Sequence, residues 1–177
     1  MKRTEKVLVV VDMQNDFVDG ALGSEQAAAI VPAAVTKISS FDGDIFVTLD
    51  THFEDYLQTS EGKKLPVAHC IKGTNGWRLN KDIKAVLDEK DFTEVEKNTF
   101  GSVNLPGLIK KAAGEEDFSI ELIGLCTDIC VVSNALLLKA SFPEAPISVD
   151  SACCAGVTNE KHEAALETMR SCQIDVL

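Results

Sequence analysis

The sequence lacks both a long apolar run and a cluster of basic residues, and these absences exclude two classes of partner. None of its apolar stretches approaches the roughly 20 residues that a membrane-spanning helix needs. Lys and Arg number 17 against 28 Asp and Glu, and the formal net charge of -11 repels the phosphates of nucleic acids. We therefore predict a small-molecule partner, with neither a membrane nor a nucleic acid bound.

Signals for secretion and for cysteine-based structural sites are also missing. Nothing that resembles a signal peptide precedes the first apolar run, which follows MKRTEK. The six cysteines, at positions 70, 126, 130, 153, 154 and 172, form neither a small-loop disulfide framework nor the paired CxxC motifs of a structural zinc site. We therefore expect reduced thiols and a cytoplasmic location.

The order of apolar patterns along the chain predicts an α/β fold. Short β-branched runs alternate with helical patterns, which is typical of a parallel sheet built from βαβ units. No repeat, low-complexity tract or Pro/Gly linker divides the chain, so we expect a single domain over residues 1–177.

The expected strands span residues 7–12, 44–50, 92–96, 118–124, 146–149 and 173–177. The expected helices span residues 25–40, 80–88, 104–113, 128–141 and 159–171. Thr127 or Asp128 is the expected N-cap of the fourth helix, and Thr158 or Asn159 that of the fifth. Residues 51–78 are left as a long irregular loop, and loops of that length are usually functional or disordered.

Three reactive side chains lie where strand-like runs end. Asp12 closes the run VLVVVD, Lys97 closes FTEVEK, and Cys130 closes SIELIGLCTDIC. Ligand clefts in open α/β sheets form at the carboxyl ends of the strands. The positions predict that a carboxylate, an amine and a thiol meet in one pocket.

Cys130 is the candidate nucleophile. A helix that starts at Asp128 would place the thiol in its first turn, where free N–H groups and the helix dipole favour an anion. That setting predicts a lowered thiol pKa and a reactive thiolate. The alternative is that Cys130 is a small buried hydrophobic residue.

Asp12 and Lys97 are the candidate partners of that thiol. Asp12 could accept the thiol proton and later return it to a leaving amine, and Asp16 and Asp19 are rivals for this role. An ammonium at Lys97 would stabilise the thiolate and the negative charge that develops during acyl transfer. The alternatives are a turn aspartate and a surface lysine.

A second group of polar residues predicts a metal site in the long loop. Asp50 and His52 alternate at a strand end, so their side chains point the same way in an extended backbone. His69 follows, with a carboxylate at Glu61 between them. Two histidines and two carboxylates suit Zn, Mn or Fe better than Ca or Mg. Two further carboxylates could replace that of Glu61: Glu54 and Asp55. The alternative is that both histidines are polar loop residues.

Five segments together make the chain similar to a known family. They are VVVDMQNDF at 9–17, TLDTH at 48–52, PVAHCIKGTNGW at 66–77, VEKNTFGS at 95–102 and GLCTDICV at 124–131. With these segments the chain resembles the isochorismatase-like cysteine hydrolase superfamily, most closely its nicotinamidases and nicotinamidase-related amidases.

The resemblance implies a three-layer αβα fold around a six-stranded, mostly parallel, doubly wound sheet of strand order 3-2-1-4-5-6. Ligands would bind at the switch point between strands 1 and 4. By the same analogy the protein is expected to form a homo-oligomer.

The resemblance also implies roles for individual residues. Asp12 matches the family's base, Lys97 its lysine and Cys130 its nucleophile. A cis peptide is expected between Leu125 and Cys126, and the backbone N–H groups of Cys126 and Cys130 would form the oxyanion hole. Because true isochorismatases lack the cysteine, its presence favours amide hydrolysis.

Three metal ligands of the nicotinamidases match Asp50, His52 and His69. Glu61 corresponds to the glutamate that some members supply, although the spacing from Glu61 to His69 is one residue longer than the family pattern leads us to expect. The implied cofactor is a divalent metal, Zn in the first place with Mn or Fe as alternatives, that orients the ring nitrogen of the substrate.

One departure from the family concerns the substrate pocket. Many nicotinamidases carry a Trp or Phe about three residues before the last metal histidine, where this chain has Leu65 and Pro66. Phe17 remains as an aromatic wall. Stacking contributes roughly 0.5 to 1.5 kcal/mol beyond burial, which shifts preference without abolishing binding.

The resulting hypothesis is a metal-dependent cysteine amidohydrolase, acting on carbon–nitrogen bonds of linear amides through a thioester. Conversion of nicotinamide and water to nicotinate and ammonia, a step of NAD salvage, is the leading reaction. The first alternative is a related hydrolase acting on another small amide or on an N-carbamoyl or ureido compound. The second is a non-catalytic member of the fold that binds a ligand or partner.

Overall fold

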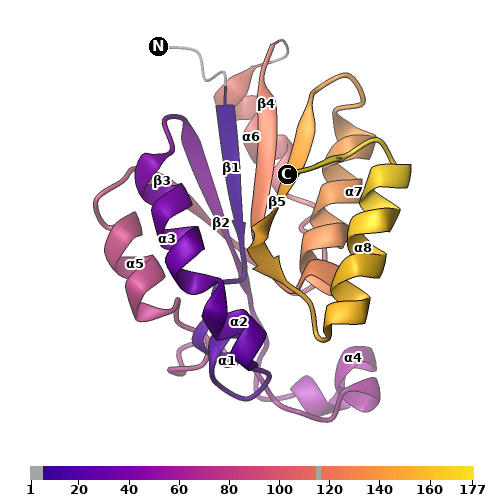
Figure 1. Cartoon of the computed structure of the whole chain (residues 1–177). Coiled ribbons are helices and arrows are strands. Elements are labelled where there is room, and N and C mark those ends of the chain that lie inside the picture. The colour runs from indigo at the N-terminus through magenta and orange to yellow at the C-terminus, as the bar shows by residue number, and fades with distance from the viewer. Residues whose placement is uncertain (1–5, 115–116) are drawn as a thin grey trace.

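A computed structural model describes residues 6–114 and 117–177. These residues form a six-stranded sheet with helices packed against it (Figure 1). Every pairing between neighbouring strands is parallel. In sheet order the strands are β3 (Phe92–Lys97), β2 (Asp44–Asp50), β1 (Lys6–Val11), β4 (Ser119–Leu125), β5 (Ile147–Ala155) and β6 (Asp175–Val176). The predicted order 3-2-1-4-5-6 is therefore confirmed.

Helices cover both faces of the sheet. One face carries α1 (Asn15–Val18), α2 (Glu25–Ala29), α3 (Val31–Ser40) and α5 (Lys81–Leu87). The other carries α6 (Leu105–Ala113), α7 (Val132–Ser141) and α8 (Asn159–Ser171). No helix in the described ranges is both long and apolar enough to span a bilayer.

Side-chain alternation in β1 explains why the sheet is buried between two layers. Val7, Val9 and Val11 belong to the core that faces α6, α7 and α8, whereas Leu8 and Val10 belong to the opposite core. A strand buried on both faces needs apolar residues at successive positions, as VLVVV provides.

Two of the predicted helices differ from the helices in the structure: one is divided in two, and the other begins with a different type of turn. The helix predicted over residues 25–40 is divided into α2 and α3 at Ile30, because Pro32 cannot occupy a helix interior and lies instead in the first turn of α3. The helix predicted over 128–141 begins with a π-helical turn, η2 (Thr127–Val131), that continues into α7. Its N-cap is Cys126, so the predicted caps Thr127 and Asp128 are wrong.

Other boundaries differ more modestly. Thr158 caps α8 by accepting a hydrogen bond from the N–H of Lys161, which confirms one of the two predicted caps. The strand predicted over 146–149 extends to Ala155 after a register shift against β4, and the strand predicted over 173–177 is shorter. Residues 51–78 are not wholly irregular, since they contain η1 (Tyr56–Gln58) and α4 (Ser60–Lys64).

Gly124 provides a test of how closely β1 and β4 approach. Its φ is +120°, and a Cβ there would overlap the carbonyl oxygen of Val11. We expect Gly124→Ala to lower the free energy of unfolding by at least about 2 kcal/mol, measured by urea denaturation.

Gly107→Ala is the matched control, because a Cβ at this exposed position in α6 meets no atom within 4 Å. It should stabilise the protein by about 0.5 kcal/mol through helix propensity. Equal effects of the two substitutions would contradict the close contact between the strands.

Candidate active site

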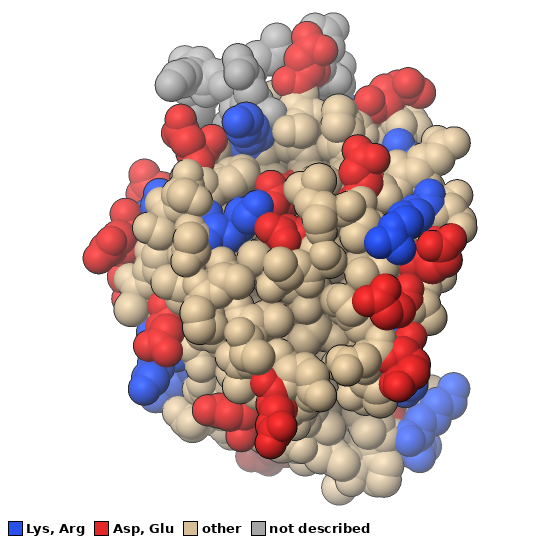
Figure 2. Space-filling model, viewed as in Figure 1, with Lys and Arg blue, Asp and Glu red and all other residues tan. Residues whose placement is uncertain are grey.

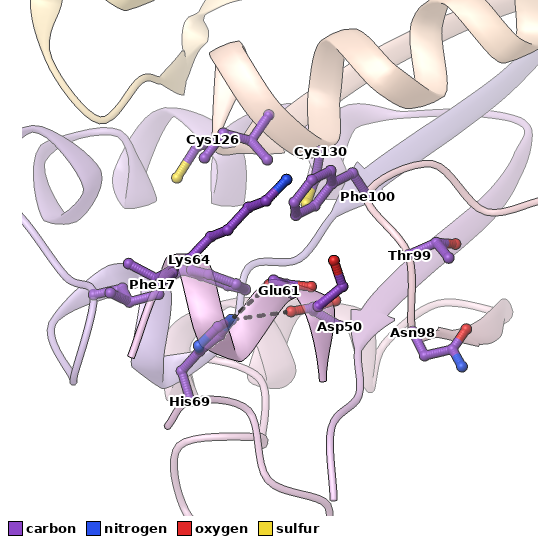
Figure 3. A pocket seen from close by; sticks show the side chains of 14 residues that line it. Phe17, Asp50, Glu61, Lys64, His69, Asn98, Thr99, Phe100, Cys126 and Cys130 are labelled. Atoms are coloured by element: carbon purple, nitrogen blue, oxygen red, sulfur yellow. Dashed lines mark ion pairs between the residues drawn. The ribbon is translucent and has the colours of Figure 1, made fainter. Parts of the chain in front are cut away.

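A cavity of about 400 Å³ opens at the carboxyl ends of β2, β3 and β4, beside the turn η2. Its lining includes Cys130 from the predicted triad and three of the predicted metal ligands, Asp50, Glu61 and His69. In Figure 3 Cys126 and Cys130 lie on one side of the cavity, and Asp50, Glu61 and His69 lie on the other.

The Lys97 ammonium lies at the centre of the predicted triad. Its Nζ is 2.7 Å from Asp12 Oδ2, 3.2 Å from Asp50 Oδ1 and 3.4 Å from Cys130 Sγ. Only 2% of the Lys97 side chain is exposed. Burial alone would lower its pKa, but the neighbouring Asp12, Cys130 and Asp50 raise it, so the ammonium stays charged. The alternative of a surface lysine is wrong.

Asp12 is fully buried just beyond the end of β1, where its backbone turns to a φ of +48°. The Thr48 hydroxyl donates a 2.7 Å hydrogen bond to Asp12 Oδ1, which leaves Oδ2 to face Lys97. Burial raises the pKa of Asp12, although the charge of Lys97 opposes the shift. A raised pKa makes this carboxylate a stronger base than an exposed aspartate.

Cys130 lies in η2, immediately after a cis peptide between Leu125 and Cys126. Burial, followed by the charge of Asp12, raises the pKa of the Cys130 thiol well above its usual value, against the opposing effect of Lys97. The predicted fall in thiol pKa at this helix start is therefore wrong, because desolvation of a nearly buried sulfur outweighs the local dipole. Such a thiol needs a base to become nucleophilic.

The metal-ligand candidates converge around one carboxylate oxygen. Asp50 Oδ2 is 3.0 Å from His52 Nε2 and 3.5 Å from His69 Nε2. Glu61 Oε1 lies 3.6 and 3.7 Å from the same two nitrogens. Ligand atoms of Asp50, His52 and His69 all lie within 4.8 Å of one another. The loop therefore brings together the four residues that the sequence proposed.

The chemistry of these donors fits a divalent metal. The Nδ1 of His69 lies 2.8 Å from the carbonyl oxygen of Val67, so an Nδ1–H tautomer leaves Nε2 free to face the carboxylates. His52 Nε2 is buried and makes no hydrogen bond with the described residues. Two imidazoles and two carboxylates form a set that suits Zn. The alternative ligands Glu54 and Asp55 are both exposed.

The Asp50 carboxylate interacts with both the triad and the metal-ligand residues. Burial would raise its pKa, yet the imidazoles of His52 and His69, 3.0 and 3.5 Å from Oδ2, and the charge of Lys97 hold the pKa of Asp50 below its ordinary value. One oxygen faces Lys97 and the other faces the imidazoles. Asp50 is therefore ionised and shared between the triad and the metal-ligand residues.

Gln14 is a supporting residue that the sequence analysis missed. Its side-chain Oε1 accepts a 2.8 Å bond from the backbone N–H of Asp50, and its Nε2 donates a 2.9 Å bond to the carbonyl of Asp50. A third bond, of 2.8 Å, runs from Nε2 to the carbonyl of Trp77. Gln14 is fully buried, and its only sequence signal was the polar turn MQNDF after an apolar strand.

Asn134 and Asp16 are further supports that sequence reasoning did not assign. Asn134 Nδ2 donates a 2.8 Å bond to the carbonyl of Cys130, and its Oδ1 accepts from the N–H of Ser102. Asp16, proposed as a rival base, instead accepts a 2.7 Å bond from the backbone N–H of Cys70. Asp16 therefore supports the segment that carries His69, and Asn134 supports the turn that carries the thiol.

Phe17 lines the cavity, as the resemblance suggested, and its ring meets His69 edge-on with centroids 5.5 Å apart. Leu65 also lines the cavity. Phe100, which lies beside Cys130 in Figure 3, also lines the cavity and was not predicted as a pocket residue. The cavity therefore has apolar walls in addition to its ionised groups.

Comparisons with known proteins match this arrangement to a family. The isochorismatase domain model matches residues 6–177. The crystal structure of nicotinamidase/pyrazinamidase PncA from Bacillus subtilis is similar with a TM-score of 0.84 at 26% identity, covering 97% of this chain and 98% of that one. The pyrazinamidase/nicotinamidase of Streptococcus mutans UA159 also gives 0.84, at 25% identity, covering 97% and 99%. The nicotinamidase/pyrazinamidase of Mycobacterium tuberculosis is 25% identical over 190 residues, covering 97% of this chain and 98% of its own.

The contacts of Lys97 predict a large loss of stability when its charge is removed. Lys97→Met leaves two buried carboxylates without their cation, which should lower the free energy of unfolding by about 3 to 5 kcal/mol. Urea denaturation of the metal-free protein measures this loss. The double variant Lys97→Met with Asp12→Asn should recover part of it, because it removes one unpaired charge. A double variant no more stable than Lys97→Met alone would contradict this account.

Proposed function

The chain belongs to the isochorismatase domain family, and on that premise we propose that it is a metal-dependent cysteine amidohydrolase of small carboxamides. The observation that carries the proposal is the Lys97 ammonium, which contacts both the Asp12 carboxylate and the Cys130 thiol beside an open cavity. A base, a nucleophile and a fixed positive charge are the parts that acyl transfer through a thioester requires.

In the first half of the proposed reaction, Asp12 takes the proton from Cys130 and the sulfur attacks the carboxamide carbon. The carbonyl oxygen becomes an oxyanion, and we assign the backbone N–H groups of Cys126 and Cys130 as its hydrogen-bond donors. The carbon–nitrogen bond then breaks. Ammonia leaves with the proton that Asp12 held, and the acyl group stays on the sulfur as a thioester.

In the second half, water enters the space that ammonia left. Asp12 removes a proton from this water, and its oxygen attacks the thioester carbon. The carbon–sulfur bond breaks, and Cys130 recovers its proton from Asp12 as the carboxylic acid forms. Lys97 remains charged throughout and stabilises whichever of Asp12 and Cys130 is anionic.

Asp50, His52, Glu61 and His69 would hold the metal. When bound, a Zn ion at this place supplies a Lewis acid that can orient a substrate ring nitrogen. Phe17 lies against His69 and would form one wall for a planar ring. This arrangement supports nicotinamide as the leading substrate, because its ring nitrogen and carboxamide would reach the two groups together.

The first test is ammonia release from nicotinamide by the purified protein. Cys130→Ala should reduce the rate more than about 1,000-fold, because no other group replaces the nucleophile. Cys172→Ala is the control, since it removes an exposed thiol that does not line the cavity. An active Cys130→Ala variant would exclude thioester chemistry.

The second test separates the metal from the triad. Treatment with a chelator should lower nicotinamide hydrolysis at least tenfold, and added Zn should restore it. Metal content, measured by atomic spectroscopy, should fall in His52→Asn and not in His162→Asn, which alters a histidine outside the ligand group. Full activity on nicotinamide without metal would contradict the proposed role of these ligands.

A further inference from the structure

We propose that Lys64 determines substrate specificity by pairing with an anionic group on the substrate. The inference extends the substrate range beyond neutral nicotinamide to carboxamides that carry a carboxylate separate from the amide that reacts. This inference rests on the proposed amidohydrolase function. Lys64 belongs neither to the triad nor to the metal ligands.

Lys64 is the last residue of the short helix α4 and lines the cavity together with Cys126 and Cys130. In Figure 3 its side chain extends across the cavity, with the ammonium directed toward the side where the cysteines lie. The preceding residue, Lys63, belongs to the same helix and is also exposed, but it does not line the cavity.

The other charges around the cavity already have partners. Asp50 and Glu61 face the two imidazoles, and Lys97 is paired with Asp12 and Asp50. Lys64, by contrast, forms no ion pair with any residue that the structure describes. A divalent metal would balance the two ligand carboxylates, so the Lys64 ammonium is the charge left for a ligand.

The negative electrostatic potential of the whole protein makes a cation in the cavity important for binding an anion. Acidic side chains are spread over the face shown in Figure 2, and the net charge of -11 repels anions. A neutral amide gains little from a lysine in its pocket. An anionic amide needs a local cation that offsets this repulsion, and Lys64 provides one.

The cavity walls fit the same class of ligand. Leu65 lines the cavity with an aliphatic side chain, which offers no ring for stacking. Phe17, Phe100 and Ile129 provide apolar contacts for the body of a ligand. A charge pair at Lys64 would then add selectivity to these apolar contacts.

The test compares nicotinamide with a pyridine carboxamide that bears an additional ring carboxylate. For the wild-type enzyme, kcat/KM for each amide is measured by ammonia release, and the ratio of the anionic to the neutral substrate is the readout. Lys64→Met should lower that ratio about two- to fivefold, as expected for an ion pair that is partly exposed to solvent. Lys64→Glu should lower it further.

Lys63→Met is the matched control, because it removes the same charge from the same helix outside the cavity. Its ratio should equal that of the wild type. Added salt should lower the wild-type ratio, by screening, and should change that of Lys64→Met less. Equal ratios in Lys64→Met and the wild type would overturn the inference, as would an equal loss in both lysine variants.

Failure of the proposed function gives a different result. If the wild type hydrolyses neither amide, binding of the carboxylated amide to the metal-loaded protein is measured by calorimetry. Weaker binding in Lys64→Met but not in Lys63→Met would still support the role of Lys64. Equal binding in all three proteins would overturn it.

Discussion

The buried ammonium of Lys97 is the interaction on which the rest of the site depends. An unpaired charge in a protein interior is costly, so Lys97 can remain buried only with anions beside it. Asp12 and Asp50 meet that need at 2.7 and 3.2 Å. Because Asp50 also faces His52 and His69, the same ion pairs that keep the lysine charged hold the thiol centre and the metal-ligand residues together.

Strand register explains how Asp12, Asp50 and Lys97 meet. Asp50 and Lys97 are directly paired at the ends of β2 and β3, and Val11, which precedes Asp12, is paired with Thr48. Parallel strands end at one edge of the sheet, so a polar residue just beyond each apolar run is delivered to the same place. On the other side of β1, the connection after β4 carries Cys130 into the crevice.

The parts of this site that follow from local pattern were predictable, and those that depend on distant contacts were not. Strand-end positions and motif spacing identified Asp12, Lys97 and Cys130, and the structure brings them together. The clamp of Gln14 on the backbone of Asp50 joins residues 36 positions apart, which no periodicity reveals. The direction of the thiol pKa was wrong for a related reason: a local rule on helix starts cannot measure burial by distant residues.

The raised pKa values have a consequence for catalysis. Burial raises the pKa of the Cys130 thiol, which keeps the proton on sulfur at rest, whereas the Lys97 ammonium opposes the rise in the pKa of Asp12 and favours its ionised carboxylate. Transfer of that proton only moves the negative charge from one neighbour of the Lys97 ammonium to another, from an oxygen at 2.7 Å to a sulfur at 3.4 Å. The total charge around the lysine is unchanged, so little reorganisation is needed. A thiol that is protonated at rest can therefore become a nucleophile beside its substrate, because the fixed cation stabilises the charge before and after transfer.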